Sequence, residues 1–124
     1  RLRWQWPTQG RLLQRFSDSD RTRQGIKIAG RFGQPIRAAE AGTIVYSGSG
    51  LIGYGRLIIV KHNKNFLSAY GHNRKILVKE GDQVAKGERI AEMGKTSDGK
   101  SMLHFEIRRK GTPVDPVALL PNQS

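Results

Sequence analysis

The sequence contains no cysteine and few acidic residues. Its 124 residues include 22 lysines and arginines but only 10 aspartates and glutamates, which gives a formal net charge of +12. Without cysteine the chain can have no disulfide scaffold, no zinc site built from thiolates and no cysteine nucleophile. The positive charge predicts anionic partners, such as nucleic acid, anionic lipid, an acidic wall polymer or an acidic protein surface. Because the basic residues are spread along the chain, a generally cationic surface and a dedicated polyanion site both remain open.

Long apolar segments are missing as well. No run approaches the roughly 18 apolar residues that a membrane-spanning helix requires, so we expect no transmembrane segment in this chain. No signal peptide is visible, and the chain begins at Arg1 without a methionine. We therefore expect residues 1–124 to form a single domain, the C-terminal fragment of a longer protein whose targeting segment lies outside this sequence.

The sequence is rich in glycine, at 15 positions, and in short segments where apolar and polar residues alternate. Such segments lie at residues 11–16, 25–30 and 103–108, and residues 36–39, 42–47, 57–62 and 66–70 are predicted to be further strands. A period of two is typical of strands that bury one face, so His104, Glu106 and Arg108 are predicted to share the face opposite the core. No segment of useful length has the period of a helix, and the sequence predicts an all-β domain.

Two further segments are rich in turns. Residues 48–55 carry four glycines, but a Walker loop needs Gly-Lys-Ser/Thr and a dinucleotide loop needs a helix directly after it. A strand follows here instead, so we interpret this segment as a hairpin loop. Residues 78–94 place valines and isoleucine between Gly-Asp and Lys-Gly turns, which is typical of short strands that fold back on one another. Residues 113–121 are expected to form a coil or turn.

The chain has three histidines, His62, His72 and His104. A lone histidine on a strand is more often a solvated or hydrogen-bonded residue than a ligand, and we interpret His62 in that way. The other two differ in their neighbours, because they lie in Tyr70-Gly71-His72 and in Leu103-His104-Phe105-Glu106. These two histidines are therefore the candidates for a functional site.

Several short motifs follow one another in a specific order. They are Gly33-Gln34-Pro35-Ile36-Arg37-Ala38-Ala39, Gly53-Tyr54-Gly55, Tyr70-Gly71-His72, the hairpin of residues 78–84 and Leu103-His104-Phe105-Glu106. In this order they resemble the motifs of the LytM or lysostaphin-type zinc endopeptidases, which cut peptidoglycan cross-links. The resemblance covers nearly the whole chain and implies compact antiparallel sheets with a groove, the duplicated hybrid motif fold.

The resemblance also implies that the metal site has been lost. The three zinc ligands of active members fall on Arg23, Lys27 and His104, and the two histidines that assist catalysis fall on His72 and Met102. A catalytic zinc ion generally needs three protein ligands and one open position. Arginine and lysine offer no lone pair while protonated, and their charges repel a dication. We therefore expect a degenerate site, no hydrolase activity, and no metal or other cofactor.

Degenerate LytM domains of the EnvC and NlpD types activate N-acetylmuramoyl-L-alanine amidases, which split the septal wall during daughter-cell separation in Gram-negative bacteria. The chain looks closer to the NlpD type, an outer-membrane lipoprotein, although Lys27 stands where even that type is expected to keep an aspartate. The resemblance therefore implies a non-catalytic amidase activator in the periplasm, anchored to the outer membrane through the missing N-terminal part.

The former active-site groove is the predicted binding surface. The residues predicted to form it are Arg23, Lys27, Tyr70, His72, Met102 and His104. Arg23 and Lys27 would pair with acidic groups of the amidase, and drift into solvated charge is the alternative for both. A peptidoglycan-binding anchor that activates no amidase stays open as a second function. Nucleic acid is not an expected partner, because a recognition helix and a regular aromatic-basic pattern are missing.

Overall fold

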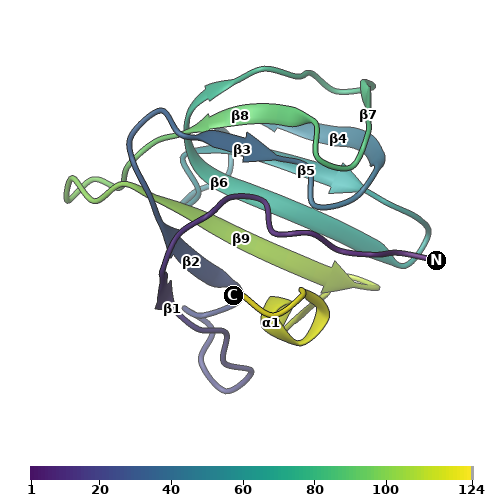
Figure 1. Ribbon diagram of the computed structural model, residues 1–124, viewed down its shortest axis with the longest axis horizontal. Helices are drawn as coiled ribbons and strands as arrows, with labels where there is room; N and C mark the ends of the chain where they lie inside the picture. Colours follow the sequence, from purple (N-terminus) through teal and green to yellow (C-terminus); the bar gives the residue numbers. More distant parts are fainter. Residues whose placement is uncertain (124) are drawn as a thin grey trace.

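Ten short strands and a single helix of four residues make up the computed structural model, which describes residues 1–123 (Figure 1). The strands are β1 (Leu12–Gln14), β2 (Ile26–Ala29), β3 (Pro35–Arg37), β4 (Gly42–Gly48), β5 (Arg56–Lys61), β6 (Phe66–Ile76), β7 (Gln83–Val84), β8 (Arg89–Met93), β9 (Met102–Arg109) and β10 (Thr112–Val114). The helix is α1 (Pro116–Leu119). The prediction of an all-β domain is confirmed.

The strands pair in the order β1-β2-β9-β6-β5-β4-β7, and every pairing is antiparallel. The longest strand, β6, has two partners on one side: residues 66–71 pair with β9, and residues 73–76 pair with β8. β8 in turn pairs with β3, so these two strands extend the sheet beside the far end of β6 (Figure 1). His72 lies where the partner changes, and its φ of 65° is rare for a residue with a side chain.

Alternating side chains from the central strands form the core. In β9, Leu103, Phe105 and Ile107 are each 0% exposed, and they pack with Ile26 and Ile28 of β2. Because successive side chains point to opposite faces, the intervening residues of β9 face the other side of the sheet. The sequence prediction for this strand is therefore confirmed, and the polar face that it defines carries the candidate site.

Tyr70 belongs to the core and not to the groove. The prediction that it helps to form the groove is wrong, because its side chain is 0% exposed. Its hydroxyl accepts a hydrogen bond from the backbone N–H of Ala39 at 2.9 Å and lies 2.7 Å from Ser68 Oγ. Ser68 Oγ lies 2.7 Å from His62 Nε2, and His62 Nδ1 lies 2.7 Å from the Ala41 carbonyl oxygen. Burial raises the pKa of Tyr70 to about 12, so the phenol stays protonated.

This chain of hydrogen bonds fixes the tautomer of His62. The Ala41 carbonyl can only accept, so His62 carries its proton on Nδ1 and accepts from Ser68 through Nε2. Ser68 then accepts from Tyr70, whose own oxygen accepts from the backbone. Burial lowers the pKa of His62, which favours this neutral form. The interpretation of His62 as a hydrogen-bonded residue is confirmed.

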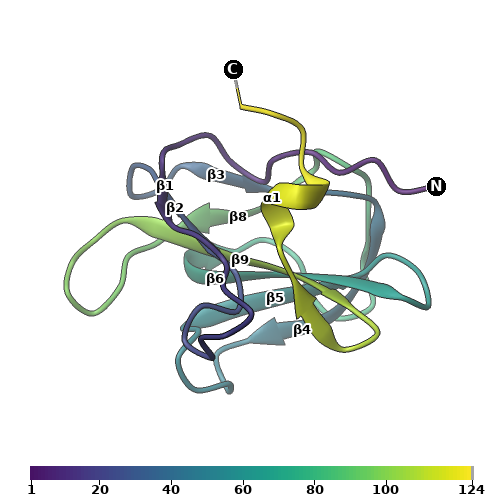
Figure 2. The same ribbon diagram turned by 90° about the horizontal axis from the view of Figure 1, so that it is seen from below.

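The N-terminal segment of the chain contacts its C-terminal segment. Trp6 Nε1 donates to the carbonyl oxygen of Pro121 at 2.7 Å, and the C-terminal segment runs beyond α1 (Figure 2). The sequence predicted only coil or turn here, but β10 and α1 form, with Asp115 accepting from the N–H of Val117 to cap the helix. In residues 1–123 no helix has the length and apolar character needed to cross a membrane.

The buried hydroxyl of Tyr70 predicts a measurable loss of stability on replacement. Tyr70→Phe leaves the Ala39 N–H without an acceptor in the core, so we expect a loss of about 1–3 kcal/mol in the free energy of unfolding. Tyr46→Phe is the matched control, because its hydroxyl accepts from Gly50 N–H in an exposed loop where water can replace it. Urea unfolding of the three proteins measures the difference. Equal losses for the two variants would contradict the assignment.

Candidate functional site

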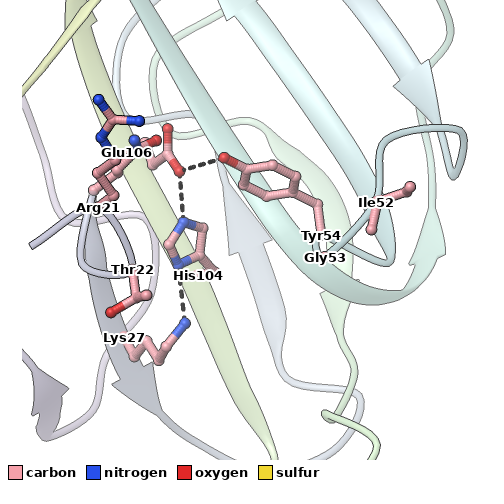
Figure 3. Close-up of a pocket in the computed structure, with 9 residues that line it drawn as sticks. Arg21, Thr22, Lys27, Ile52, Gly53, Tyr54, His104 and Glu106 are labelled. Atoms are coloured by element: carbon pink, nitrogen blue, oxygen red, sulfur yellow. Dashed lines mark hydrogen bonds and ion pairs between the residues drawn. The ribbon is translucent and has the colours of Figure 1, made fainter.

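A polar hollow of about 250 Å³ opens on the sheet face opposite the core, and we call it the groove. It lies between the loop that precedes β2 and the loop that joins β4 to β5. Figure 2 shows these two loops projecting on the same side of the molecule. The residues that line the groove are Arg21, Thr22, Gln24, Lys27, Ile52, Gly53, Tyr54, His104 and Glu106 (Figure 3).

A continuous chain of hydrogen bonds crosses the groove. Lys27 and His104 lie directly opposite each other on β2 and β9, and Lys27 Nζ is 3.2 Å from His104 Nδ1. His104 Nε2 is 2.7 Å from Oε2 of Glu106, which also accepts from the Tyr54 hydroxyl at 2.9 Å (Figure 3). The other carboxylate oxygen of Glu106 accepts from Arg108 Nε at 2.8 Å. Alternation along β9 places His104, Glu106 and Arg108 on this one face.

The donors in this chain set the protonation of His104. An ammonium group has no acceptor, so Lys27 donates to Nδ1, and Nε2–H donates to the carboxylate of Glu106. Burial by itself raises the pKa of Glu106, but hydrogen bonds and charge from His104 and Arg108 lower it below its usual value. Burial lowers the pKa of Lys27, and the charge of Glu106 opposes that effect. Both nitrogens of the His104 ring are thus occupied by protein groups.

His72 lies beside this chain and does not line the groove itself. Its ring centroid is 6.2 Å from that of His104, and its backbone N–H donates to the Tyr54 carbonyl oxygen at 2.7 Å. Regular alternation along β6 would place His72 on the same face as Tyr70, and the positive φ at His72 interrupts that alternation. Burial, and to a smaller extent the neighbouring Lys27 and His104, lower the pKa of His72 to about 4. The imidazole is therefore neutral at physiological pH.

Met102 and Arg23 lie outside the groove. Met102 is on the same face of β9 as His104 but is 7% exposed and pairs with Ala29. Arg23 was predicted to edge the groove, but its Nε donates to the carbonyl oxygen of Arg15 at 3.0 Å. Its side chain lines a different hollow together with residues 12–15. The loop curls before β2, and this curl brings Arg21 and Thr22 to the groove in its place.

Two central residues of the site were missed at the sequence level. Glu106 carried a usable signal, because it shares the predicted polar face of β9 with His104. Tyr54 was noted only as part of the Gly53-Tyr54-Gly55 motif, and nothing in the sequence indicates that its hydroxyl reaches Glu106 across the sheet. Of the six predicted residues, the structure brings Lys27 and His104 together in the groove and sets His72 beside them.

The groove residues do not fit a catalytic zinc ion. Such an ion needs three protein ligands with free lone pairs, and here the ammonium of Lys27 is hydrogen-bonded to His104 Nδ1 while Glu106 holds Nε2. A lysine ammonium cannot act as a ligand, and its charge repels a metal cation. Residues 1–123 contain no group of three His, Cys, Asp or Glu side chains placed to hold a metal.

The chain belongs to peptidase family M23, whose family model matches residues 21–116. It is 56% identical over 120 residues to the lipoprotein NlpD/LppB homolog of Pseudomonas aeruginosa, covering 97% of this chain and 40% of that protein. It is 48% identical over 120 residues to the murein hydrolase activator NlpD of Escherichia coli, covering 97% of this chain and 32% of the relative.

Solved structures show the same architecture. The catalytic domain of lysostaphin from Staphylococcus simulans aligns with a TM-score of 0.73 at 26% identity, covering 88% of both chains. Csd3 of Helicobacter pylori aligns with a TM-score of 0.85 at 25% identity, covering 97% of this chain and 33% of that one. The LytM or lysostaphin-type fold expected from the sequence motifs is confirmed. The likeness to NlpD lipoproteins is confirmed as well.

The environment of His72 predicts an acid-shifted titration. We expect its imidazole to titrate near pH 4 in the folded protein, and Lys27→Met to raise this pKa by removing a nearby positive charge. Because the folded value lies below the ordinary 6.5, the unfolded chain binds more protons between the two values. The contribution of His72 to stability is therefore complete above pH 6.5 and is lost as the pH falls toward 4.

NMR titration of the imidazole Cε1–H signals measures both effects. Lys61→Met, which removes an exposed charge on β5, is the matched control and should leave the His72 titration unchanged. A midpoint near 6.5 in the wild type, or identical midpoints with and without Lys27, would contradict the assigned environment.

Proposed function

We propose that the chain is a non-catalytic activator of N-acetylmuramoyl-L-alanine amidases, acting in septal wall splitting and daughter-cell separation. The names of its relatives support this proposal, since they include a murein hydrolase activator and outer membrane lipoproteins. Those names describe longer proteins. This chain covers 40% of the Pseudomonas aeruginosa relative and 32% of the Escherichia coli relative. Because relatives carry lipoprotein names, we also propose that the domain lies in the periplasm. In this proposal residues 1–124 form one degenerate LytM-type domain.

The ammonium group of Lys27 is the observation that carries the proposal. In the sequence motif of the zinc endopeptidases, this position supplies a metal-binding carboxylate. Here a half-buried cation contacts His104 instead, and the lysine takes part in none of the ion pairs found in residues 1–123. Without a metal there is neither an activated water nor a polarised carbonyl for hydrolysis. The site instead offers an unpaired positive charge to an incoming anionic group.

The groove is suited to an acidic segment of the amidase. Lys27 and Arg21 provide positive charge, and the carboxylate of Glu106 is already compensated by Arg108. The exposed loop contributes Ile52, which is 99% exposed and can pack against an apolar part of the same segment. Charge-assisted contacts to Lys27 would fix the position of that segment.

Activation follows if the docked segment is the one that keeps the amidase closed. An amidase held off by its own regulatory helix has a closed and an open state. A groove that binds the helix more tightly in the open state shifts the population toward that state. The activator needs no chemistry of its own for this effect, and Arg23 and Met102, which lie outside the groove, are not required to touch the segment.

Dye release from labelled peptidoglycan sacculi tests the proposal. We expect no release by this domain alone with added zinc, and strong release by the domain together with a candidate amidase. Lys27→Glu should reduce the activated rate about tenfold or more, because it replaces the attractive charge by a repulsive one in a half-buried site. The fold of each variant is checked by urea unfolding.

Lys61→Glu is the matched control, since it makes the same charge change at an exposed position on β5. It should leave activation unchanged. Zinc-dependent release by the domain alone would overturn the non-catalytic assignment. An amidase that can be activated by other means, yet stays silent with this domain, would count against the activator function and favour a peptidoglycan-binding anchor.

A further inference from the structure

One strand of the sheet is apolar on both of its faces. An antiparallel sheet with a core on one side normally alternates between apolar and polar residues. In β5 the residues that alternate with the core side chains are Leu57 and Ile59, which are apolar as well. Ile59 lies opposite Ala69 of β6, and Ala69 lies opposite Glu106 of β9. Directly opposite residues share one face of a sheet, so these apolar side chains lie on the same face as the groove.

The apolar residues of this face help to form a second hollow of about 210 Å³, which we call the apolar hollow. The residues that line it are Leu51, Tyr54, Leu57, Ile59, Leu67, Ser68, Ala69, Glu106 and Arg108. Part of this lining is buried, since Leu57 is 2% and Ala69 is 8% exposed, whereas Leu51 is 45% exposed. An apolar cavity of roughly 150 Å³ admits benzene. The apolar hollow therefore has room for one leucine or phenylalanine side chain.

The side chain of Tyr54 separates the apolar hollow from the groove, because it lines both of them. Its hydroxyl donates to Glu106 at 2.9 Å, and its ring centroid lies 5.5 Å from that of His104 (Figure 3). Its backbone carbonyl oxygen accepts from the N–H of His72 at 2.7 Å. These contacts fix the ring as a wall between an apolar compartment and the compartment that contains Lys27.

The charges around the two compartments select the chemistry of a ligand. The carboxylate of Glu106 is buried and is compensated by Arg108 at 2.8 Å. Lys27, on the other side of the Tyr54 ring, takes part in no ion pair of residues 1–123. A ligand that fits both compartments therefore carries an apolar group beside an acidic one. A second copy of this chain is not that ligand, because two domains with a formal net charge of +12 each repel one another.

We propose that the apolar hollow is a second docking subsite, which takes one leucine- or phenylalanine-sized side chain of the amidase segment. An acidic residue of the same segment meets Lys27 on the other side of Tyr54. The identity of the partner rests on the proposed function, whereas the hollow itself does not. Residues three or four positions apart are neighbours on one helix face, so a helix with an acidic and a large apolar residue at this spacing fits both compartments. The apolar hollow thereby distinguishes such a segment from one that is merely acidic.

Calorimetric titration of the domain with a purified candidate amidase tests the subsite. Ile59→Ala removes part of the apolar lining and should weaken binding about fivefold to tenfold. Ala69→Leu fills the hollow with a side chain of the domain itself and should weaken binding by about tenfold or more. Leu77→Ala is the matched control, because it shortens a 41% exposed side chain that does not line the hollow. It should bind nearly as tightly as the wild type. Urea unfolding checks the fold of each variant.

The salt dependence of binding separates the two compartments. Salt screens charges but not apolar contacts, so Ile59→Ala should weaken binding by the same factor at low and high salt. Lys27→Gln should instead reduce the dependence of the dissociation constant on salt, because it removes a charge that meets the ligand. Equal affinities of Ala69→Leu and the wild type, or equal losses in Ile59→Ala and Leu77→Ala, would overturn the subsite.

Indole serves as a probe of the apolar hollow in the absence of any amidase. In an NMR titration, the methyl signals of Ile59 and Leu67 should shift on addition of indole to the wild type but not to Ala69→Leu. An absence of these shifts in the wild type would overturn the hollow as a binding site. Shifts with indole, but no binding of an amidase by any of the proteins, would contradict the proposed function and the amidase as occupant. The two proposals can therefore fail separately.

Discussion

The negative charge of a carboxylate buried in a sheet has to be compensated by neighbouring donors. The arrangement of the groove follows from the hydrogen bonds that compensate Glu106. The side chain is 1% exposed, and an uncompensated charge there would be strongly destabilising. Its partners are His104, Arg108 and the hydroxyl of Tyr54. The first two lie on the same strand, but Tyr54 comes from the loop between β4 and β5. The carboxylate therefore fixes the ring of His104, which meets Lys27, and ties the exposed loop to the sheet.

The same arrangement places a positive charge, the ammonium group of Lys27, in the groove without a metal ion. A zinc ion supplies positive charge and a Lewis acid, whereas an ammonium group supplies only the charge. Lys27 thus brings positive charge to the groove but no Lewis acid. His72 beside it stays neutral, because burial and the neighbouring charges lower its pKa to about 4. In the proposed function, this combination favours a site that holds a partner segment over one that cleaves it.

The sequence predicted the strands best where alternation was unbroken, as in β2 and β9. It failed where local geometry departs from a period of two. His72 adopts a φ of 65° between the two pairing partners of β6, so alternation could not place it or show that Tyr70 faces the core. Arg23 was assigned by motif position, but the curl of the preceding loop decides which side chain meets the groove. The four-residue helix leaves too short a pattern to detect, and the contact of Tyr54 with Glu106 depends on tertiary structure alone.

The contact between Lys27 and His104 joins residues 77 positions apart in the chain. Loop closure over such a distance must precede the pairing of β2 with β9, and contacts of this range form slowly compared with local hairpins. Hairpins such as β4–β5 can form early, but none of them contains both halves of the groove. A nascent or proteolytically shortened chain that lacks β9 therefore has no groove at all. The groove is thus a product of tertiary pairing, and no single hairpin of the fold provides it.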